Sequence, residues 1–141
     1  MKKIFTVAVF TILFSVIFAQ SNVKLMDLSI VPYYSDSVVV NNQNQELGIL
    51  FKMNKAHLAQ QVHVLFGTGE NQSNIALFQA TITENAGLYY VNFNGAQEAI
   101  INYSCKINIV LTTNQVANYT HVTLYVTDIN GNESNRFIFE K

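Results

Sequence analysis

After residue 20, apolar and polar side chains alternate along most of the chain. Successive side chains of a β-strand point to opposite faces, whereas an amphipathic helix repeats its apolar positions about every 3.6 residues. The segment 47–53 illustrates the strand pattern, because every second residue from Leu47 to Met53 is large and apolar. Similar blocks, which end at Asn, Gly, Asp or Ser, predict strands over residues 23–30, 47–53, 62–66, 75–83, 88–93, 103–111, 122–126 and 136–140.

Short polar segments connect these blocks. Glu84–Gly87 predicts a tight hairpin, since Asn85 and Gly87 tolerate the positive φ that such a connection needs. Only residues 54–60 and 96–101 are expected to form helix, each for a turn or two. Seven or eight strands without a long helix predict an all-β chain in which two antiparallel sheets pack face to face.

The first residues are typical of a signal peptide. A cationic start, Met1–Lys3, precedes the apolar run Ile4–Phe18, which is shorter than the roughly 20 residues of a membrane-spanning helix. We therefore expect residues 1–19 to be removed after Ala19, leaving one domain over residues 20–141. The product is expected to be extracytoplasmic, either secreted or periplasmic, with no membrane span after cleavage.

The segment Val122–Asn135 is similar to the final hairpin of bacterial immunoglobulin-like and fibronectin type III-like modules, in which an alternating strand runs into a Thr-Asp-x-x-Gly-Asn-x-Ser turn. The resemblance implies an immunoglobulin-like antiparallel β-sandwich of seven to eight strands. Modules of this kind serve adhesion, assembly and spacing as well as ligand binding. Asn130 and Gly131 suit the positive φ values of a type I′ turn, and Asp128 can cap backbone N–H groups across it. The Cys pair and buried Trp of antibody domains are missing.

Charge and composition narrow the range of partners. The chain has eight Lys and Arg residues against nine Asp and Glu, a formal net charge of −1, and it loses Lys2 and Lys3 with the leader. Because no basic surface remains to hold a phosphate backbone, nucleic acid is not an expected partner. One Cys and three His residues are too few for a disulfide framework or a Cys-rich zinc site, so no metal or other cofactor is expected.

Cys105, two histidines and one turn are candidates for a reactive thiol or a metal site. Cys105 lies in phase with the row from Tyr103 to Leu111, which predicts an inward-facing and inert thiol. His63 and His121 fall on the polar sides of their strands, where solvated imidazoles are expected, although they would meet if those strands paired in register. The Asp128–Asn132 turn presents side-chain oxygens at alternate positions, which leaves calcium binding open, but its spacing does not fit the EF-hand and favours a plain hairpin turn.

Tyrosines are the candidate contact residues. Neighbouring rings of a strand lie on opposite faces, so Tyr34, Tyr90 and Tyr125 are expected to point outward. Exposed tyrosines anchor protein partners or stack on sugars. Since no catalytic constellation is recognisable, we expect a non-enzymatic binding or assembly module that acts through a sheet face or an edge strand on another envelope or surface protein. A carbohydrate-binding module that uses these tyrosines is the alternative.

Overall fold

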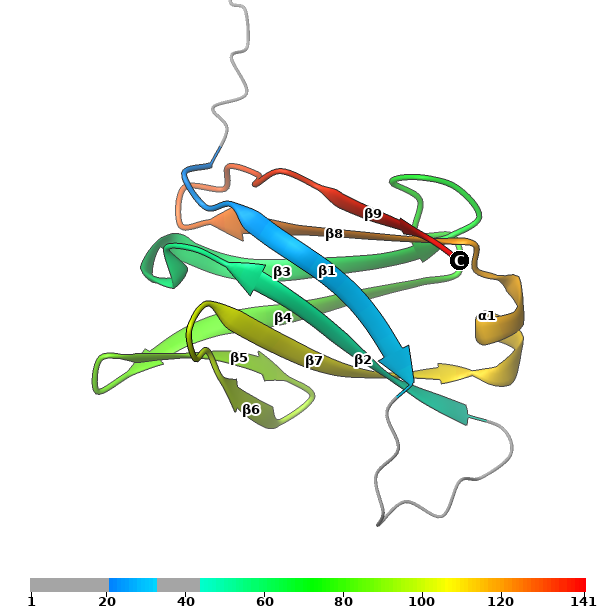
Figure 1. Cartoon of the computed structure of the whole chain (residues 1–141), viewed down its shortest axis with the longest axis horizontal. Coiled ribbons are helices and arrows are strands. Elements are labelled where there is room, and N and C mark those ends of the chain that lie inside the picture. Colours follow the sequence, from blue (N-terminus) through cyan, green and yellow to red (C-terminus); the bar gives the residue numbers. More distant parts are fainter. Residues whose placement is uncertain (1–20, 33–43) are drawn as a thin grey trace, which may run out of the picture.

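Nine strands form two antiparallel sheets in the computed structural model, which describes residues 21–32 and 44–141 (Figure 1). The strands are β1 (Leu25–Pro32), β2 (Asn44–Met53), β3 (Ala59–Gly67), β4 (Ala76–Asn85), β5 (Leu88–Phe93), β6 (Ala96–Ala99), β7 (Ser104–Thr112), β8 (His121–Asp128) and β9 (Phe137–Glu140). One sheet has the order β1-β2-β7, and the other has the order β6-β5-β4-β3-β8-β9. This arrangement confirms the predicted all-β sandwich and is compatible with an immunoglobulin-like fold. The predicted leader, residues 1–19, lies outside the described residues.

The alternation seen in the sequence reappears in the burial of the strands. Every second residue of β7 from Cys105 to Leu111 is buried, while the residues between them are half-buried or exposed. β7 pairs with β2 in an unbroken antiparallel register, from Asn44 opposite Thr112 to Lys52 opposite Ser104. Because directly paired residues share a face, the buried row of β7 continues into the buried row of β2.

The hydrophobic core lies between the two sheets. Its largest fully buried side chains are Phe66, Ile49, Met53, Ile107, Ile109, Leu111 and Leu124, which come from both sheets. The Phe66 ring contacts the ring of Phe78 edge to face at a centroid distance of 5.9 Å and the ring of Tyr119 at 5.1 Å. Aromatic rings packed in this way stabilise the core beyond the area that they bury.

The expectation of helix over residues 96–101 is wrong, because Ala96–Ala99 forms β6. Phe93 pairs with Ala96 across a two-residue turn in which φ is +48° at Asn94 and +80° at Gly95. Asn-Gly is the preferred sequence of a type I′ turn, whose twist matches that of antiparallel strands. The Asn94–Gly95 turn therefore favours a strand over residues 96–99, although these residues include good helix formers.

Two short helical segments connect strands. The 3-10 turn η1 (Ala56–Leu58) lies within residues 54–60 and confirms the helical turn expected there. The helix α1 (Thr113–Asn118), which the sequence analysis missed, begins with a reciprocal capping box between Thr112 and Gln115. Thr112 Oγ1 accepts a hydrogen bond from the Gln115 N–H at 3.2 Å, and Gln115 Oε1 accepts one from the Thr112 N–H at 2.9 Å. This Thr-x-x-Gln signal was readable in the sequence.

The β4–β5 hairpin has a different turn from the one expected. Asn85 pairs with Leu88, so the turn consists of Ala86 and Gly87, with φ of +52° and +80°. The left-handed conformation is therefore adopted by Ala86 and not by Asn85. Unlike Asn, Ala has no side-chain hydrogen bond that stabilises this conformation. A left-handed backbone costs a residue with a Cβ roughly 1–2 kcal/mol.

We expect Ala86→Asn to stabilise the protein by about 0.5–1 kcal/mol, because Asn tolerates the left-handed region and Asn-Gly is the preferred type I′ pair. Urea unfolding followed by circular dichroism measures the change. Gly87→Ala is the matched control: its added Cβ would meet no atom within 4 Å, so φ alone should make it destabilising. Equal effects of the two substitutions would contradict the turn geometry.

Candidate functional site

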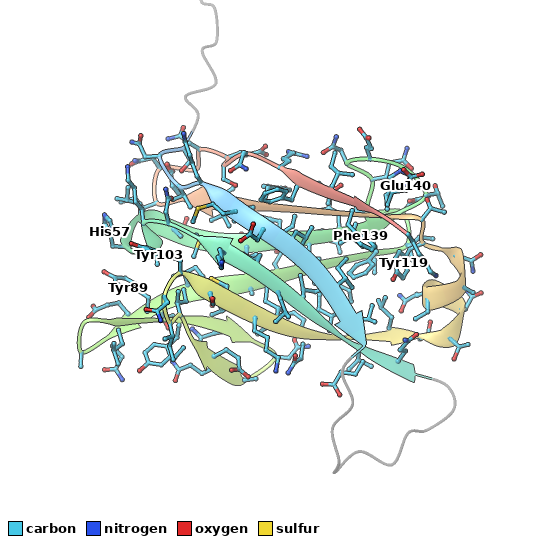
Figure 2. The ribbon with its side chains drawn as sticks, viewed as in Figure 1. His57, Tyr89, Tyr103, Tyr119, Phe139 and Glu140 are labelled. Carbon is cyan, nitrogen blue, oxygen red and sulfur yellow. The ribbon has the colours of Figure 1, made fainter. Side chains whose placement is uncertain are left out.

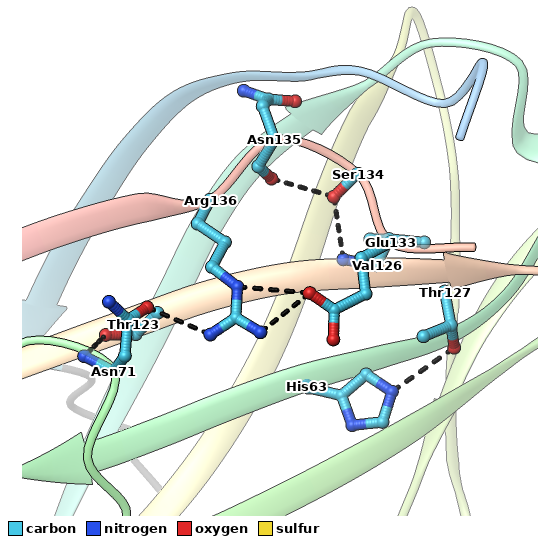
Figure 3. A network of polar contacts seen from close by, with 9 residues as sticks. All are labelled: His63, Asn71, Thr123, Val126, Thr127, Glu133, Ser134, Asn135 and Arg136. Atoms are coloured by element: carbon cyan, nitrogen blue, oxygen red, sulfur yellow. Dashed lines mark hydrogen bonds and ion pairs between the residues drawn. The ribbon is translucent and has the colours of Figure 1, made fainter. Parts of the chain in front are cut away.

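A polar and aromatic cluster lies on the outer face of the six-stranded sheet (Figure 3). His63 on β3 is paired with Tyr125 on β8, and their rings stack at a centroid distance of 4.5 Å with planes 8° apart. The guanidinium carbon of Arg136 lies 4.2 Å from the centre of the Tyr125 ring. Tyr125 thus has a ring stacked on it and a cation over it, an arrangement that the ring quadrupole favours. We call His63, Tyr125, Arg136, Glu133 and Asn71 the His63 cluster.

Arg136 joins two connections that are far apart in the sequence. Its Nη2 and Nε donate to Glu133 Oε2 at 2.7 and 3.2 Å, and its Nη1 donates to Asn71 Oδ1 at 2.9 Å. Asn71 lies in the β3–β4 loop, and its backbone N–H donates to Thr123 Oγ1 at 2.9 Å. The guanidinium therefore fixes the β3–β4 loop to the connection between β8 and β9.

His63 is only 8% exposed, so the expectation of a solvated imidazole is wrong. Gln79 Nε2 lies 3.2 Å from His63 Nδ1, and Thr127 Oγ1 lies 3.2 Å from Nε2. Because the Gln79 amide nitrogen can only donate, these contacts fit a neutral ring with its proton on Nε2. Burial lowers the pKa of His63, Glu133 opposes this shift and Arg136 adds to it.

His63 on β3 and His121 on β8 do not contact each other, although the two strands are paired. His63 is opposite Tyr125, and His121 is opposite Gly67 at the other end of β3. His121 Nδ1 instead lies 2.8 Å from Thr120 Oγ1, its chain neighbour. His57, the third histidine, is exposed in η1. The register therefore keeps the three imidazoles apart.

We expect the free energy of unfolding to fall as the pH drops below about 6.5, the ordinary pKa of His63, toward the lower pKa of the folded state. Over that range the unfolded chain binds a proton that the folded protein does not, so acidification favours unfolding. Urea unfolding at several pH values between about 7.5 and 5.5 measures the slope. His63→Phe keeps an aromatic ring on Tyr125 without the titration, so its curve should be flatter, and an unchanged slope would contradict this assignment.

Cys105 is a buried thiol, as predicted from its phase in β7. It is 3% exposed, and burial raises its pKa to about 12. Its Sγ lies 3.6 Å from the carbonyl oxygen of Tyr103. The shallow depression of ≈ 440 Å³ that it helps to line is bordered by a Lys52–Asp27 ion pair at 3.1 Å. Since the thiolate is the nucleophilic form, this side chain is placed for packing and not for covalent chemistry.

The β8–β9 turn is closed by Asp128, which confirms its predicted capping role. Asp128 Oδ1 accepts hydrogen bonds from the N–H groups of Asn130 and Asn132 at 2.8 and 2.9 Å. Positive φ is found at Gly131 but not at Asn130, and the Gly131 N–H donates to the Asp128 carbonyl at 2.9 Å. The turn is therefore of type I followed by a left-handed glycine, and not the expected type I′. The carboxylate is already occupied by N–H donors, which favours the plain hairpin turn over a calcium site.

Of the three tyrosines predicted as contacts, Tyr34 lies outside the described residues. Tyr90 is half-buried on β5, opposite Thr83 and Ala99. Tyr125 is on the outer face as expected, but His63 and Arg136 lie against its ring. A sugar could stack on this ring only if Arg136 left its bonds to Glu133 and Asn71, which weighs against Tyr125 as a carbohydrate platform.

Three large apolar side chains are exposed at the start of β5 and in the turn between β6 and β7, where the sequence did not indicate them. Leu88, Ile101 and Tyr103, which we call the turn patch, are 59%, 65% and 60% exposed. The Ile100 N–H donates to the Tyr89 carbonyl at 2.8 Å, which continues the pairing of β5 and β6 toward Leu88 and Ile101. Figure 2 shows Tyr89 and Tyr103 at this same end of the molecule. Large apolar side chains that face water together are typical of interaction sites.

Tyr103 was expected to face inward with Cys105, and this is wrong. The segment 101–104 forms a tight turn in which Asn102 and Tyr103 have φ of +50° and +68°. The turn is closed by the Ser104 N–H, which donates to the Ile101 carbonyl at 2.9 Å. A bulky side chain is rarely found in the left-handed region, and such strain is concentrated at functional positions.

Over residues 21–32 and 44–141, no three His, Cys, Asp or Glu side chains form a group that could hold a metal ion. The same residues include no helix with the length and apolar character needed to cross a membrane. Comparison of the chain with models of protein families, with curated proteins and with solved structures found no match in any of the three.

Proposed function

We propose that this chain is an exported, non-enzymatic module of immunoglobulin-like fold that binds another protein of the cell envelope or surface. The turn patch is the observation that carries this proposal. Leu88, Ile101 and Tyr103 each expose more than half of their surface, at the start of β5 and in the turn between β6 and β7. Aromatic and aliphatic side chains that a partner can desolvate supply most of the binding energy of protein interfaces.

The conformation of Tyr103 adds to this support. Its φ of +68° would cost a glycine nothing, so the aromatic side chain is kept there against a backbone preference. Tyr103 is 60% exposed, so burial of its own ring in the core does not account for the aromatic side chain. A contact with a partner would account for a tyrosine at this unfavourable backbone conformation.

Affinity capture from envelope fractions, followed by quantitative mass spectrometry, tests the proposal with two matched double variants. Ile101→Ser combined with Tyr103→Gly removes two of the three side chains of the turn patch and relieves the strained φ, so it should fold at least as well as the wild type and lose most of its partner. Leu77→Ser combined with Ile138→Ser removes two exposed aliphatic side chains of β4 and β9, on the outer face of the six-stranded sheet, and should keep the partner. N-terminal sequencing of the exported protein should begin at Gln20.

The proposal would be wrong if the Ile101 and Tyr103 variant retained every partner that the wild type captures. Loss of the partner in the Leu77 and Ile138 variant alone would assign binding to the outer sheet face instead of the turn patch. Circular dichroism of both variants separates loss of binding from loss of fold.

A further inference from the structure

The two sheets end in four edge strands, which differ in how well they are protected. β1 is bulged at Asp27, where φ is +53°, and the Asn135 side chain bonds to both the N–H and the carbonyl of Leu25. β6 and β9 have only four residues each. β7 has nine residues, with neither a bulge nor a proline, and β2 is the only strand that pairs with it among the described strands. At its two ends the backbone of Ser104 bonds to Ile101 and the Thr112 N–H donates to Gln115 Oε1, so the open edge lies between these residues. A long, regular edge of this kind is a template for pairing with another strand.

The six-stranded sheet continues past this edge. In Figure 1, β5 and β6 extend beyond β7 on the side away from β2. Phe93 on β5 and Ile100 after β6 pack against the core but are only partly buried. The inner face of β5 and β6 thus forms an apolar ledge beside β7, and a strand added to β7 would lie over it. Such a strand needs apolar side chains at every second position to cover the ledge.

One charged side chain on this ledge, Glu98, indicates which charge the added strand should carry. Glu98 on β6 pairs with Val91, a core residue that is 1% exposed, so the Glu98 side chain is on the inner face of the sheet. Glu98 is half-buried, and the ion pairs found among the described residues do not include it. A carboxylate in this position gains most from a cation that arrives with the strand covering it.

We propose that the free edge of β7 accepts an extended segment of the partner protein, which carries apolar side chains at alternate positions and a Lys or Arg opposite Glu98. The inference rests on the proposed function and names the segment of the partner that is recognised. Backbone hydrogen bonds to β7 supply the affinity, and the ledge with Glu98 supplies the specificity. Ile101 and Tyr103 of the turn patch come directly before the start of β7, at one end of this edge.

A synthetic peptide of the length of β7 tests this directly. It alternates Thr with Val, and its inward positions include one Lys and one Trp. The protein contains no Trp, so the emission of the peptide reports on its own burial. Titration with the full exported protein should give a saturable blue shift. Two further peptides carry N-methyl groups at every second residue, one at the odd positions and one at the even positions. One of them should lose the blue shift and the other should keep it, because only one edge of a strand faces β7.

Charge exchange tests the role of Glu98. Glu98→Lys should weaken binding of the Lys peptide about three- to tenfold, and replacing the peptide Lys with Glu should restore it. Glu140→Lys makes the same charge change on β9, at the opposite edge of the sheet, and should affect the two peptides equally. Circular dichroism of each variant confirms that it is folded.

Several results would overturn the inference. They are the lack of a saturable shift up to the solubility limit of the peptide, equal binding of the two methylated phases, and equal effects of Glu98→Lys and Glu140→Lys. A dimer of the protein that protects the β7 amides would show that a second copy occupies the edge, which also contradicts it. If these peptides fail while the turn-patch variant loses its envelope partner, the proposed function stands and only the β7 inference falls.

Discussion

Phe66→Ala is expected to lower the free energy of unfolding by about 3–5 kcal/mol, the range found for large-to-small substitutions in well-packed cores. Phe66 is fully buried on β3, and its ring packs edge to face on Phe78 and Tyr119. The substitution removes the transfer energy of the ring and leaves a cavity that the ring of Phe78 on β4 and the ring of Tyr119 after α1 cannot easily fill. A loss of this size is a large part of the total stability of a single domain.

Urea unfolding followed by circular dichroism measures the effect of Phe66→Ala. Leu77→Ala is the control, because Leu77 is 52% exposed on the neighbouring strand and should change stability by less than about 0.5 kcal/mol. Phe66→Leu should fall between the two. If Phe66→Ala and Leu77→Ala cost the same, the two sheets do not enclose the core at this position.

Asp128→Ala should cost about 2–3 kcal/mol, because it removes a charged acceptor that holds two backbone N–H groups of the β8–β9 turn. Asp128 is 6% exposed and accepts hydrogen bonds from the backbone of Asn130 and Asn132. Burial acts to raise the pKa of Asp128, but hydrogen bonds from those two backbone N–H groups and from the side chains of Ser21 and Asn132 outweigh it and lower the pKa below its ordinary value.

The lowered pKa of Asp128 gives this prediction a pH dependence. The stabilisation is fully present above the ordinary pKa of about 3.8 and is lost as the pH falls through the folded value, since the unfolded chain takes up the proton first. Asp128→Asn keeps an acceptor oxygen without the charge, so it should cost less than Asp128→Ala and flatten the curve below about pH 4. Urea unfolding across this range measures both variants, and parallel curves for wild type and Asp128→Asn would contradict the role of the carboxylate.

Local patterns account for most of the strands. The alternation from Cys105 to Leu111 correctly predicted which face of β7 is buried in the core, because every second side chain of a strand lies on the same face. Where the sequence analysis failed, local signals were present but were not used. Asn94–Gly95 specifies the β5–β6 turn, and Thr112 with Gln115 specifies the start of α1.

The candidate sites could be predicted only in part. Tyr125 lies on the outer face, as alternation requires, yet its availability depends on Arg136 and His63, which come from other strands and connections. Tyr103 was assigned to an inward row because Cys105 follows in phase, whereas the tight turn at 101–104 reverses the chain before the strand begins. Side-chain contacts across strands depend on pairing that alternation does not encode.

The sequence by itself determined the all-β class, the inward row that contains Cys105 and the capping role of Asp128, since each depends on residues within a few positions of one another. Only the tertiary structure decided that His63 is buried under Tyr125, that β7 is the longest edge strand among the described residues, and that β5 and β6 extend beyond it. The physical reason is that a strand pattern states which way a side chain points. What covers that side chain, or leaves it open to a partner, depends on segments that are distant in the sequence.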